Sequence, residues 1–334
     1  MGFFDTLSRG WTLSKLSFSV VKADPELLLY TFLSAMMVFV TIAAAAYPGY
    51  EAEQSDESHW AMTDQVIDPE TDEPKMVMNE ETGKLEPVGR EPTGEYMAWI
   101  FLTYMIGSII VVFWNSAIIV SAHERLTGGD PTIMTGIKAA FSRIHIIILW
   151  GIIAGTVGLL LRIARDAISN KKAPAALKIL AGIMLWMVEI AWWMYTFFII
   201  PMIVLEKKGI GDGLRGGRAL FGKTWGENVT SGLGIGFISL VGIVFSLAVA
   251  GLIFFTISPI VGIIVAVALI GIIVLWTNTA EVVVVAALYE YAKTGKMPDL
   301  NGNGAKFEEA LPWESKSGWA NESAETKAWR EGTG

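Results

Sequence analysis

The sequence predicts an all-α fold, a polytopic helical membrane bundle of about six transmembrane helices with amphipathic interfacial helices beside it. The 334-residue chain is 53% hydrophobic and only 17% charged, and its mean hydropathy is +0.49. Its apolar residues lie in long runs, and a run of about 20 apolar residues can cross a bilayer as a helix. The charged residues gather between these runs, as they do in the connections of membrane proteins.

The predicted membrane domain covers residues 27–293 and contains all six spans. The first span starts after Asp24-Pro25-Glu26, where Asp24 can cap a helix and Pro25 suits its first position. Pro48-Gly49 is expected to end that span. The spans lie at about 27–47, 96–120, 144–161, 176–205, 231–256 and 259–277, the last running as far as 291 on a longer interpretation.

Three further segments flank or interrupt this domain. Residues 1–26 have aromatic and basic residues at near-helical spacing, which predicts an amphipathic helix on the membrane surface. The insert 48–95 holds 14 acidic and 3 basic residues, whereas the whole chain has a net charge of −8. Within it, residues 75–88 have the pattern of a small β-hairpin. Residues 294–334 form a polar tail.

The distribution of basic residues predicts the orientation. Six spans place both termini on one side, together with the basic connections 121–143 and 206–228, which indicates the cytoplasm. We therefore expect a multi-pass protein of the cell membrane with the acidic loop 48–95 outside. The basic segment 162–178 then also falls outside, and we predict that it docks against that loop.

Glu189 stands alone in an apolar run and is the main candidate for an intramembrane role. Ala175, Gly182 and Thr196 share its helical face, so we expect it to face another helix. No basic residue is expected at the same depth. Two roles stay open: an interhelical hydrogen bond, which we favour, and a proton-relay or ion-binding carboxylate.

Other intramembrane polar residues cluster towards one end of the spans. Asn115 lies late in the second span, and Asn278 and Glu281 lie late in the sixth. Together they could line a cytoplasmic vestibule, although interfacial hydrogen bonding is the simpler interpretation.

Glycine spacing predicts sites of close helix packing. Gly151 and Gly155, like Gly232 and Gly236, have the Gly-xxx-Gly spacing that lets membrane helices approach closely, within one chain or between copies. Gly182 belongs to the small-residue face around Glu189.

Several chemistries have weak support. Gly217, Gly222, Lys223 and Thr224 match a phosphate-binding loop formally, but no strand precedes them. The carboxylates of residues 68–72 fit a calcium loop poorly. The chain has no cysteine and three histidines, so we expect no metal site, no cofactor and no enzymatic activity. No basic patch with aromatics points to nucleic acid.

Two stretches carry a family resemblance. Residues 197–228 contain a span ending in proline, an acidic residue, and a glycine-rich segment closing with Lys-x-Trp-Gly, and residues 287–298 read ALYEYAKTGKMP. They resemble uncharacterised prokaryotic (archaeal or bacterial) polytopic membrane proteins, distantly similar to membrane domains related to those of glycerophosphodiester phosphodiesterases. The resemblance covers about residues 120–298 and implies a helical membrane domain without implying an activity.

These observations predict a non-enzymatic scaffold, membrane organiser or accessory subunit. Its expected partners are the lipid bilayer and a second copy or another membrane protein. The alternative is a transporter or channel that uses Glu189.

Overall fold

The computed structural model describes residues 3–54, 76–78, 85–87, 93–170 and 174–294. Six segments in this part of the chain are helical, long and apolar enough to cross a membrane. The predicted all-α polytopic bundle is therefore confirmed. The helices are α1 (Phe3–Ala23), α2 (Glu26–Gln54), α3 (Gly94–Leu126), α4 (Ile133–Ser142), α5 (Ile144–Asn170), α6 (Ala175–Thr196), α7 (Ile199–Val204), α8 (Ile210–Thr256) and α9 (Pro259–Thr294).

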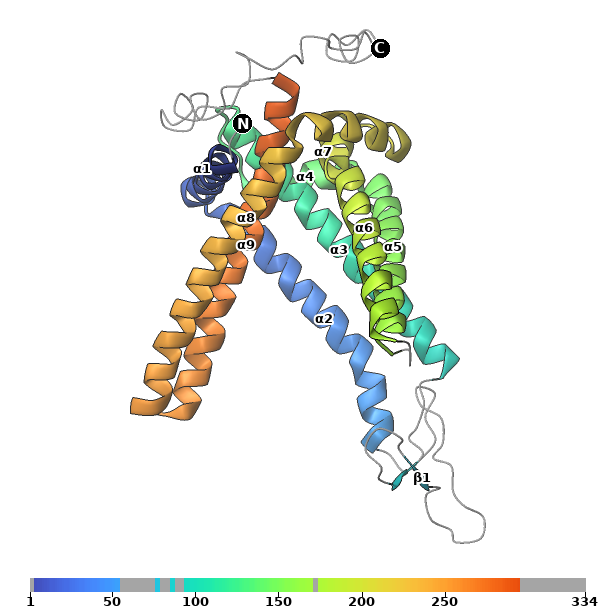
Figure 1. Ribbon diagram of the computed structural model, residues 1–334. Helices are drawn as coiled ribbons and strands as arrows, with labels where there is room; N and C mark the ends of the chain where they lie inside the picture. The colour runs from blue at the N-terminus through green and yellow to red at the C-terminus, as the bar shows by residue number, and fades with distance from the viewer. Residues whose placement is uncertain (1–2, 55–75, 79–84, 88–92, 171–173, 295–334) are drawn as a thin grey trace.

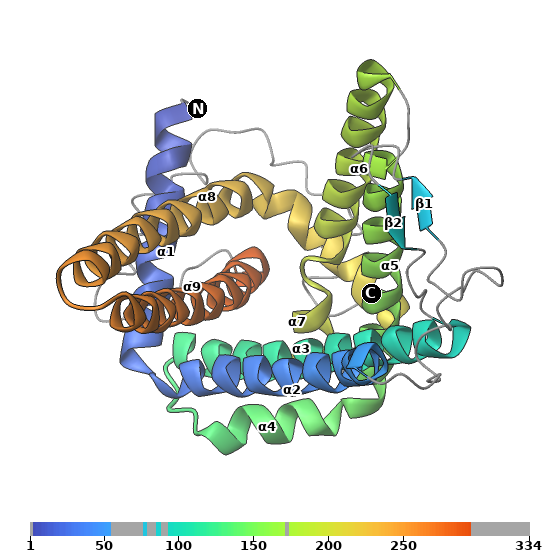
Figure 2. The ribbon, with the colours of Figure 1, turned by 90° about the horizontal axis from the view of Figure 1, so that it is seen from below.

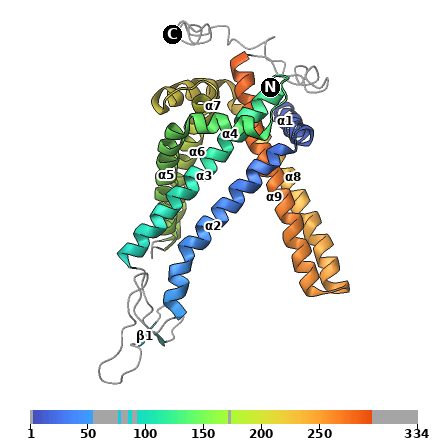
Figure 3. The same ribbon diagram turned by 180° about the vertical axis from the view of Figure 1, so that it is seen from behind.

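The helices diverge from one end of the molecule. In Figure 1, the paired α8 and α9 extend to one side, α3, α5 and α6 extend to the other, and α2 runs between them; Figure 3 shows the same division from behind. We call the common end, where α1, α4, α7 and the last turns of α9 meet, the junction end. Figure 2 shows that α1 crosses α8 and α9, while α4 lies along α3.

The hydrophobic core lies at the junction end. Tyr30, Phe198 and Tyr289, which come from α2, the α6–α7 connection and α9, are all fully buried there. The hydroxyl of Tyr30 donates to the carbonyl oxygen of Ile133 at 2.8 Å and lies 3.1 Å from Ser121 Oγ. A buried hydroxyl needs such partners, and these partners tie α2 to α3 and to the start of α4.

The first span does not end at Pro48, as the sequence predicted, because α2 continues to Gln54. A proline inside a helix leaves the carbonyl four residues earlier without its N–H donor. Here that carbonyl belongs to Ala44, and the indole N–H of Trp99 on α3 lies 3.4 Å from it. Tyr96 donates to the next carbonyl, Ala45, at 2.9 Å. Side chains of α3 thus support α2 where proline weakens it.

The predicted fourth span, 176–205, is interrupted. α6 ends at Thr196 and α7 begins at Ile199. Pro201 cannot donate to the carbonyl of Phe197, and its ring crowds that carbonyl, which accounts for the break. The interruption lets Phe198 enter the core.

Other boundaries differ mainly in length. α5 runs to Asn170 instead of ending near 161, and α9 reaches Thr294. α8 has 47 residues. Its first part, predicted as a connection, runs across the junction end, and its second part contains the fifth span (Figure 1).

The acidic insert contains a short ribbon. β1 (Met76–Met78) pairs antiparallel with β2 (Leu85–Pro87), with Met76 opposite Pro87. This pairing agrees with the predicted β-hairpin. Its turn, the acidic residues 68–72 and most of the insert lie outside the described residues.

Candidate functional site

An ionic group at the junction end joins α9 to the connection after α7. The phenol of Tyr289 donates to the Glu206 carboxylate, and Lys293 Nζ lies 2.5 Å from Glu206 Oε1. Tyr289 is buried, and its ring meets that of Phe198 edge-on at 6.0 Å. We call Glu206, Tyr289 and Lys293 the junction triad.

The triad sets the charge of Glu206. Burial alone would raise the pKa of this carboxyl, but the hydrogen bonds from Lys293 and Tyr289 outweigh burial and hold the pKa below its ordinary value. Glu206 is therefore ionised at neutral pH. Because both donors lie on α9, the carboxylate fixes the last turns of α9 against α7.

Another set of polar contacts at the junction end involves Arg143. Arg143 donates to the carbonyl oxygens of Lys207 and Lys208 at 2.8 and 2.9 Å. These carbonyls belong to the turn between α7 and α8, where Lys207 has a φ of 57°, a left-handed conformation that is uncommon for a residue with a side chain. Arg143, the residue between α4 and α5, thus holds this turn in place.

Three more contacts between basic and acidic side chains involve α3. Arg125 lies 3.6 Å from Asp24 and 3.2 Å from Asp130. His123 Nδ1 lies 3.4 Å from the Glu290 carboxylate. These contacts fasten α3 to α9 and to the connection between α1 and α2.

Glu189 has a basic partner that the sequence analysis did not expect. The guanidinium of Arg165 on α5 binds the Glu189 carboxylate on α6. Glu189 is 24% exposed and Arg165 64% exposed. The premise that no basic residue lies at its depth is wrong, because the long arginine side chain reaches along the helix pair. Glu189 does face a neighbouring helix, and the pair links α5 to α6.

One basic residue of the segment 162–178, Arg165, is therefore paired within the helix bundle. Its predicted docking against the acidic loop involves residues outside the described part of the chain.

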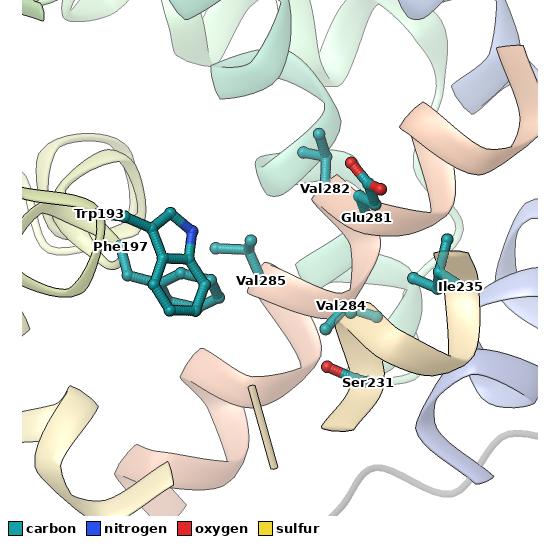
Figure 4. Close-up of a pocket in the computed structure, with 9 residues that line it drawn as sticks. Trp193, Phe197, Ser231, Ile235, Glu281, Val282, Val284 and Val285 are labelled. Atoms are coloured by element: carbon teal, nitrogen blue, oxygen red, sulfur yellow. The ribbon is translucent and has the colours of Figure 1, made fainter. Parts of the chain in front are cut away.

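A cavity of about 380 Å³ lies between α6, α8 and α9. Trp193 and Phe197 line it from the end of α6, and Ser231, Gly232 and Ile235 line it from α8. Glu281 and three valines, at 282, 284 and 285, line it from α9. Figure 4 shows the two aromatic rings on one side of this stretch of α9 and the α8 residues on the other.

Glu281 is the unusual group in this cavity. Among the residues that the structure describes, no hydrogen bond or ion pair reaches its carboxylate, whereas Glu189, Glu206 and Glu290 each contact a basic side chain. All the lining residues lie in the candidate membrane spans. The cavity therefore presents one carboxyl group, at an exposed position, among walls that are apolar and aromatic apart from Ser231.

The two asparagines do not join Glu281 and Glu189 in a path. Asn278 donates to the Val274 carbonyl of its own helix at 2.9 Å, and its side chain is exposed. Asn115 is half-buried on α3 and does not line the cavity. Of the predicted residues, the cavity brings together Glu281 and Gly232.

The glycines fall into two groups. A Cβ atom placed on Gly151 would lie 2.8 Å from the Ile109 Cα atom, and one on Gly155 would lie 2.9 Å from the Ser108 Cβ atom, so α5 touches α3 at both positions. Ser108 also donates to the Gly151 carbonyl at 2.8 Å. By contrast, Gly182, Gly232 and Gly236 have open space beside them. The sequence left open whether Gly232 and Gly236 pack within one chain or between copies; no neighbour within the described part of this chain lies against them, and packing between copies stays a prediction.

The formal phosphate-loop match has no structural support. α8 is helical from Ile210 through residues 217–224, and the segment before it is α7, not a strand. Within the described part of the chain, no group of three metal-ligating side chains gathers.

The sequence pattern did not single out Glu206, Tyr289 and Lys293 as a group, although a signal was present. Glu206 lies in the 197–228 stretch and the other two lie in 287–298, the two stretches that carry the family resemblance. In the structure these stretches meet.

The fold and these sites define a multi-pass helical membrane protein with a densely paired junction and a lateral cavity. The chain belongs to a family of unknown function, DUF6159, which matches residues 94–299. This region starts with α3 and includes both the junction triad and the cavity. No curated protein matches the chain.

Proposed function

We propose that this protein is a non-enzymatic membrane scaffold or accessory subunit that assembles with copies of itself. One observation carries the proposal. The junction end is closely packed, whereas α8 and α9 extend from it with large apolar side chains exposed along residues 236–276, which we call the α8–α9 arm. A rigid base with projecting apolar helices suits a protein that contacts other membrane helices.

Small residues on the α8–α9 arm favour a second copy of this chain as the partner that packs against it. Gly236, Gly251 and Gly271 have nothing within 4 Å of a Cβ position. In a bilayer, helix association depends on close packing at small residues, because lipid gives no hydrophobic driving force. Open glycines on an apolar face therefore favour contact with another helix.

Native mass in lipid nanodiscs tests this proposal. We expect a closed oligomer for the wild type and a monomer for Gly236→Leu combined with Gly251→Leu. Gly182→Leu, which changes an equally open glycine on α6 outside the arm, is the matched control and should keep the oligomer. A wild-type monomer would refute self-assembly.

We further propose that the junction end lies in the cytoplasm of a cell membrane, with both termini there and loop 48–95 outside. Arg125, Lys138, Arg143, Arg215 and Arg218 belong to the segments at this end, and such a bias favours the cytoplasmic side. The chain has no cysteine, so single cysteines can be labelled without background. An impermeant thiol reagent applied to whole cells should label Thr256→Cys but not Ser142→Cys; the reverse pattern would invert the orientation.

A transport role is the second candidate, and the Glu281 cavity is the observation that favours it. The sequence alone favours Glu189 for such a role, but the bond from Arg165 makes that carboxylate a poor ion site. Glu189→Gln should leave any ion or proton flux of reconstituted protein unchanged. The distant similarity to membrane domains related to glycerophosphodiester phosphodiesterases stays a prediction.

A further inference from the structure

We propose that the Glu281 cavity binds a lipophilic organic cation, with Glu281 as its counter-ion and Trp193 and Phe197 as its aromatic wall. This proposal concerns a ligand site and does not depend on self-assembly. Three features of the cavity carry it: its size, its lining and a carboxyl group that has no partner among the described residues.

The size suits a small molecule. Ligand pockets commonly have volumes of about 300–1,000 Å³, and this cavity has about 380 Å³. It is bounded by three membrane-spanning segments, from α6, α8 and α9. A ligand with apolar groups can therefore reach it from the bilayer.

The lining favours a cation over an anion or a neutral ligand. A carboxylate within apolar surroundings is costly unless a positive charge or a proton neutralises it. Aromatic faces attract cations as well, and this attraction grows where water is excluded. Trp193 and Phe197 lie on one side of the α9 stretch that carries Glu281 (Figure 4). None of the described residues that line the cavity is basic.

The lack of a partner in the described part of the chain distinguishes Glu281 from its neighbours. The nearest ionic contacts along α9 belong to Tyr289 and Glu290, which bind Glu206 and His123. Glu290 is nine residues from Glu281, or roughly 14 Å along a helix. These junction groups contact one another and not Glu281, which leaves the Glu281 carboxyl group for an external partner.

Binding of radiolabelled tetraphenylphosphonium to the full chain in nanodiscs tests the proposal, with empty nanodiscs as the blank. We expect saturable binding by the wild type and a loss of affinity of roughly tenfold or more for Glu281→Gln, which keeps the shape and removes the charge. Trp193→Leu should weaken binding by roughly threefold and leave the carboxylate in place. The neutral analogue tetraphenylmethane should not compete.

Glu189→Gln is the matched control, because it removes a carboxylate of α6 one turn from Trp193 that does not line the cavity. Its affinity should stay within about twofold of the wild type. Equal binding by Glu281→Gln and the wild type would overturn the proposal, and so would no binding by the wild type or displacement by tetraphenylmethane. Glu281-dependent proton flux without cation binding would make the proton the ligand and would also overturn it. The oligomer mass is read separately, so failure here leaves the scaffold proposal standing.

Discussion

The apolar half of α9 is exposed and the more polar half is buried, which is the reverse of the pattern in a water-soluble protein. Residues 259–276 are almost entirely apolar, yet Gly262 is the only one of them that is buried. Residues 277–294 include Thr, Asn, Glu, Tyr and Lys, and most of this half is buried, including Thr277, Thr279 and Tyr289. Polar and small side chains hold membrane helices together, whereas apolar side chains gain nothing by leaving lipid. The junction end is therefore stabilised by contacts between side chains, whereas the α8–α9 arm is stabilised by its exposure to lipid.

The largest difference in stability is expected between substitutions of two phenylalanines, one at the junction end and one in the arm. Phe198 is 0% exposed at the junction end, and Phe255 is 86% exposed at the tip of the arm. Phe198→Ala should lower the free energy of unfolding by about 3–5 kcal/mol, because it empties a packed site. Phe255→Ala should change it by less than about 0.5 kcal/mol.

Chemical denaturation of the purified protein in mixed micelles measures both changes. Equal losses of unfolding free energy for the two variants would contradict the difference between the junction end and the arm within one chain. A large loss for Phe255→Ala only in nanodiscs that hold an oligomer would instead indicate that a second copy covers the arm.

The junction triad should come next in size. Glu206→Gln removes the charge that holds Lys293 and weakens the bond from Tyr289, and we expect a loss of about 1–3 kcal/mol. Asp212→Asn is the control, because its pair with Arg215 is exposed on both sides and such pairs contribute little. Similar losses for both variants would show that the triad does not stabilise the junction.

Acid should act through the same carboxyl. The pKa of Glu206 is lowered in the fold, so its contribution is fully present above its ordinary pKa of 4.5 and is lost as pH falls through the lowered value. Burial raises the pKa of Asp24, although the charge of Arg125 opposes this rise. Protonation of Asp24 at low pH therefore stabilises the fold, whereas protonation of Glu206 destabilises it. Glu206→Gln should flatten the fall in stability at low pH, and Asp24→Asn should steepen it. A pH titration of thermal unfolding that shows no difference would contradict this assignment.

Glycine substitutions extend the comparison to helix contacts. Gly151→Ala places a methyl group against the backbone of Ile109, and we expect a loss of about 1–3 kcal/mol. Gly236→Ala meets open space in the arm and should leave the stability of the monomer unchanged or slightly higher. Thermal unfolding of the two variants in monomer-forming detergent gives the difference, and equal effects would contradict the packing described here.

The smallest effect is expected for the pair between α5 and α6. Arg165 is largely exposed, so a double-mutant cycle of Arg165→Gln and Glu189→Gln should give a coupling of about 0.5–1 kcal/mol. A coupling of several kcal/mol would mean that the pair is more deeply buried in the assembled protein than in a single chain.

The sequence by itself determined the class and the number of spans. Runs of apolar residues must cross the bilayer as helices, because each backbone polar group needs a partner inside its own segment. The same local reasoning predicted the close approach at Gly151 and Gly155 and the strand pairing near residues 76–87. It failed at Pro48, where Tyr96 and Trp99 of another helix support α2. It predicted the fourth span, Ala176–Val204, but not the break near Pro201 that divides this span into α6 and α7.

Only the tertiary structure decided which polar residues meet. Glu189 found Arg165, 24 positions away, and Glu206 found Tyr289 and Lys293, 83 and 87 positions away. Periodicity gives the face of one helix, but it does not say which neighbour that face meets or whether the neighbour carries a charge. Tertiary packing therefore made Glu189 a partner in an ion pair, placed Gly232 beside a cavity, and left Glu281 as a carboxylate without a partner in the described part of the chain.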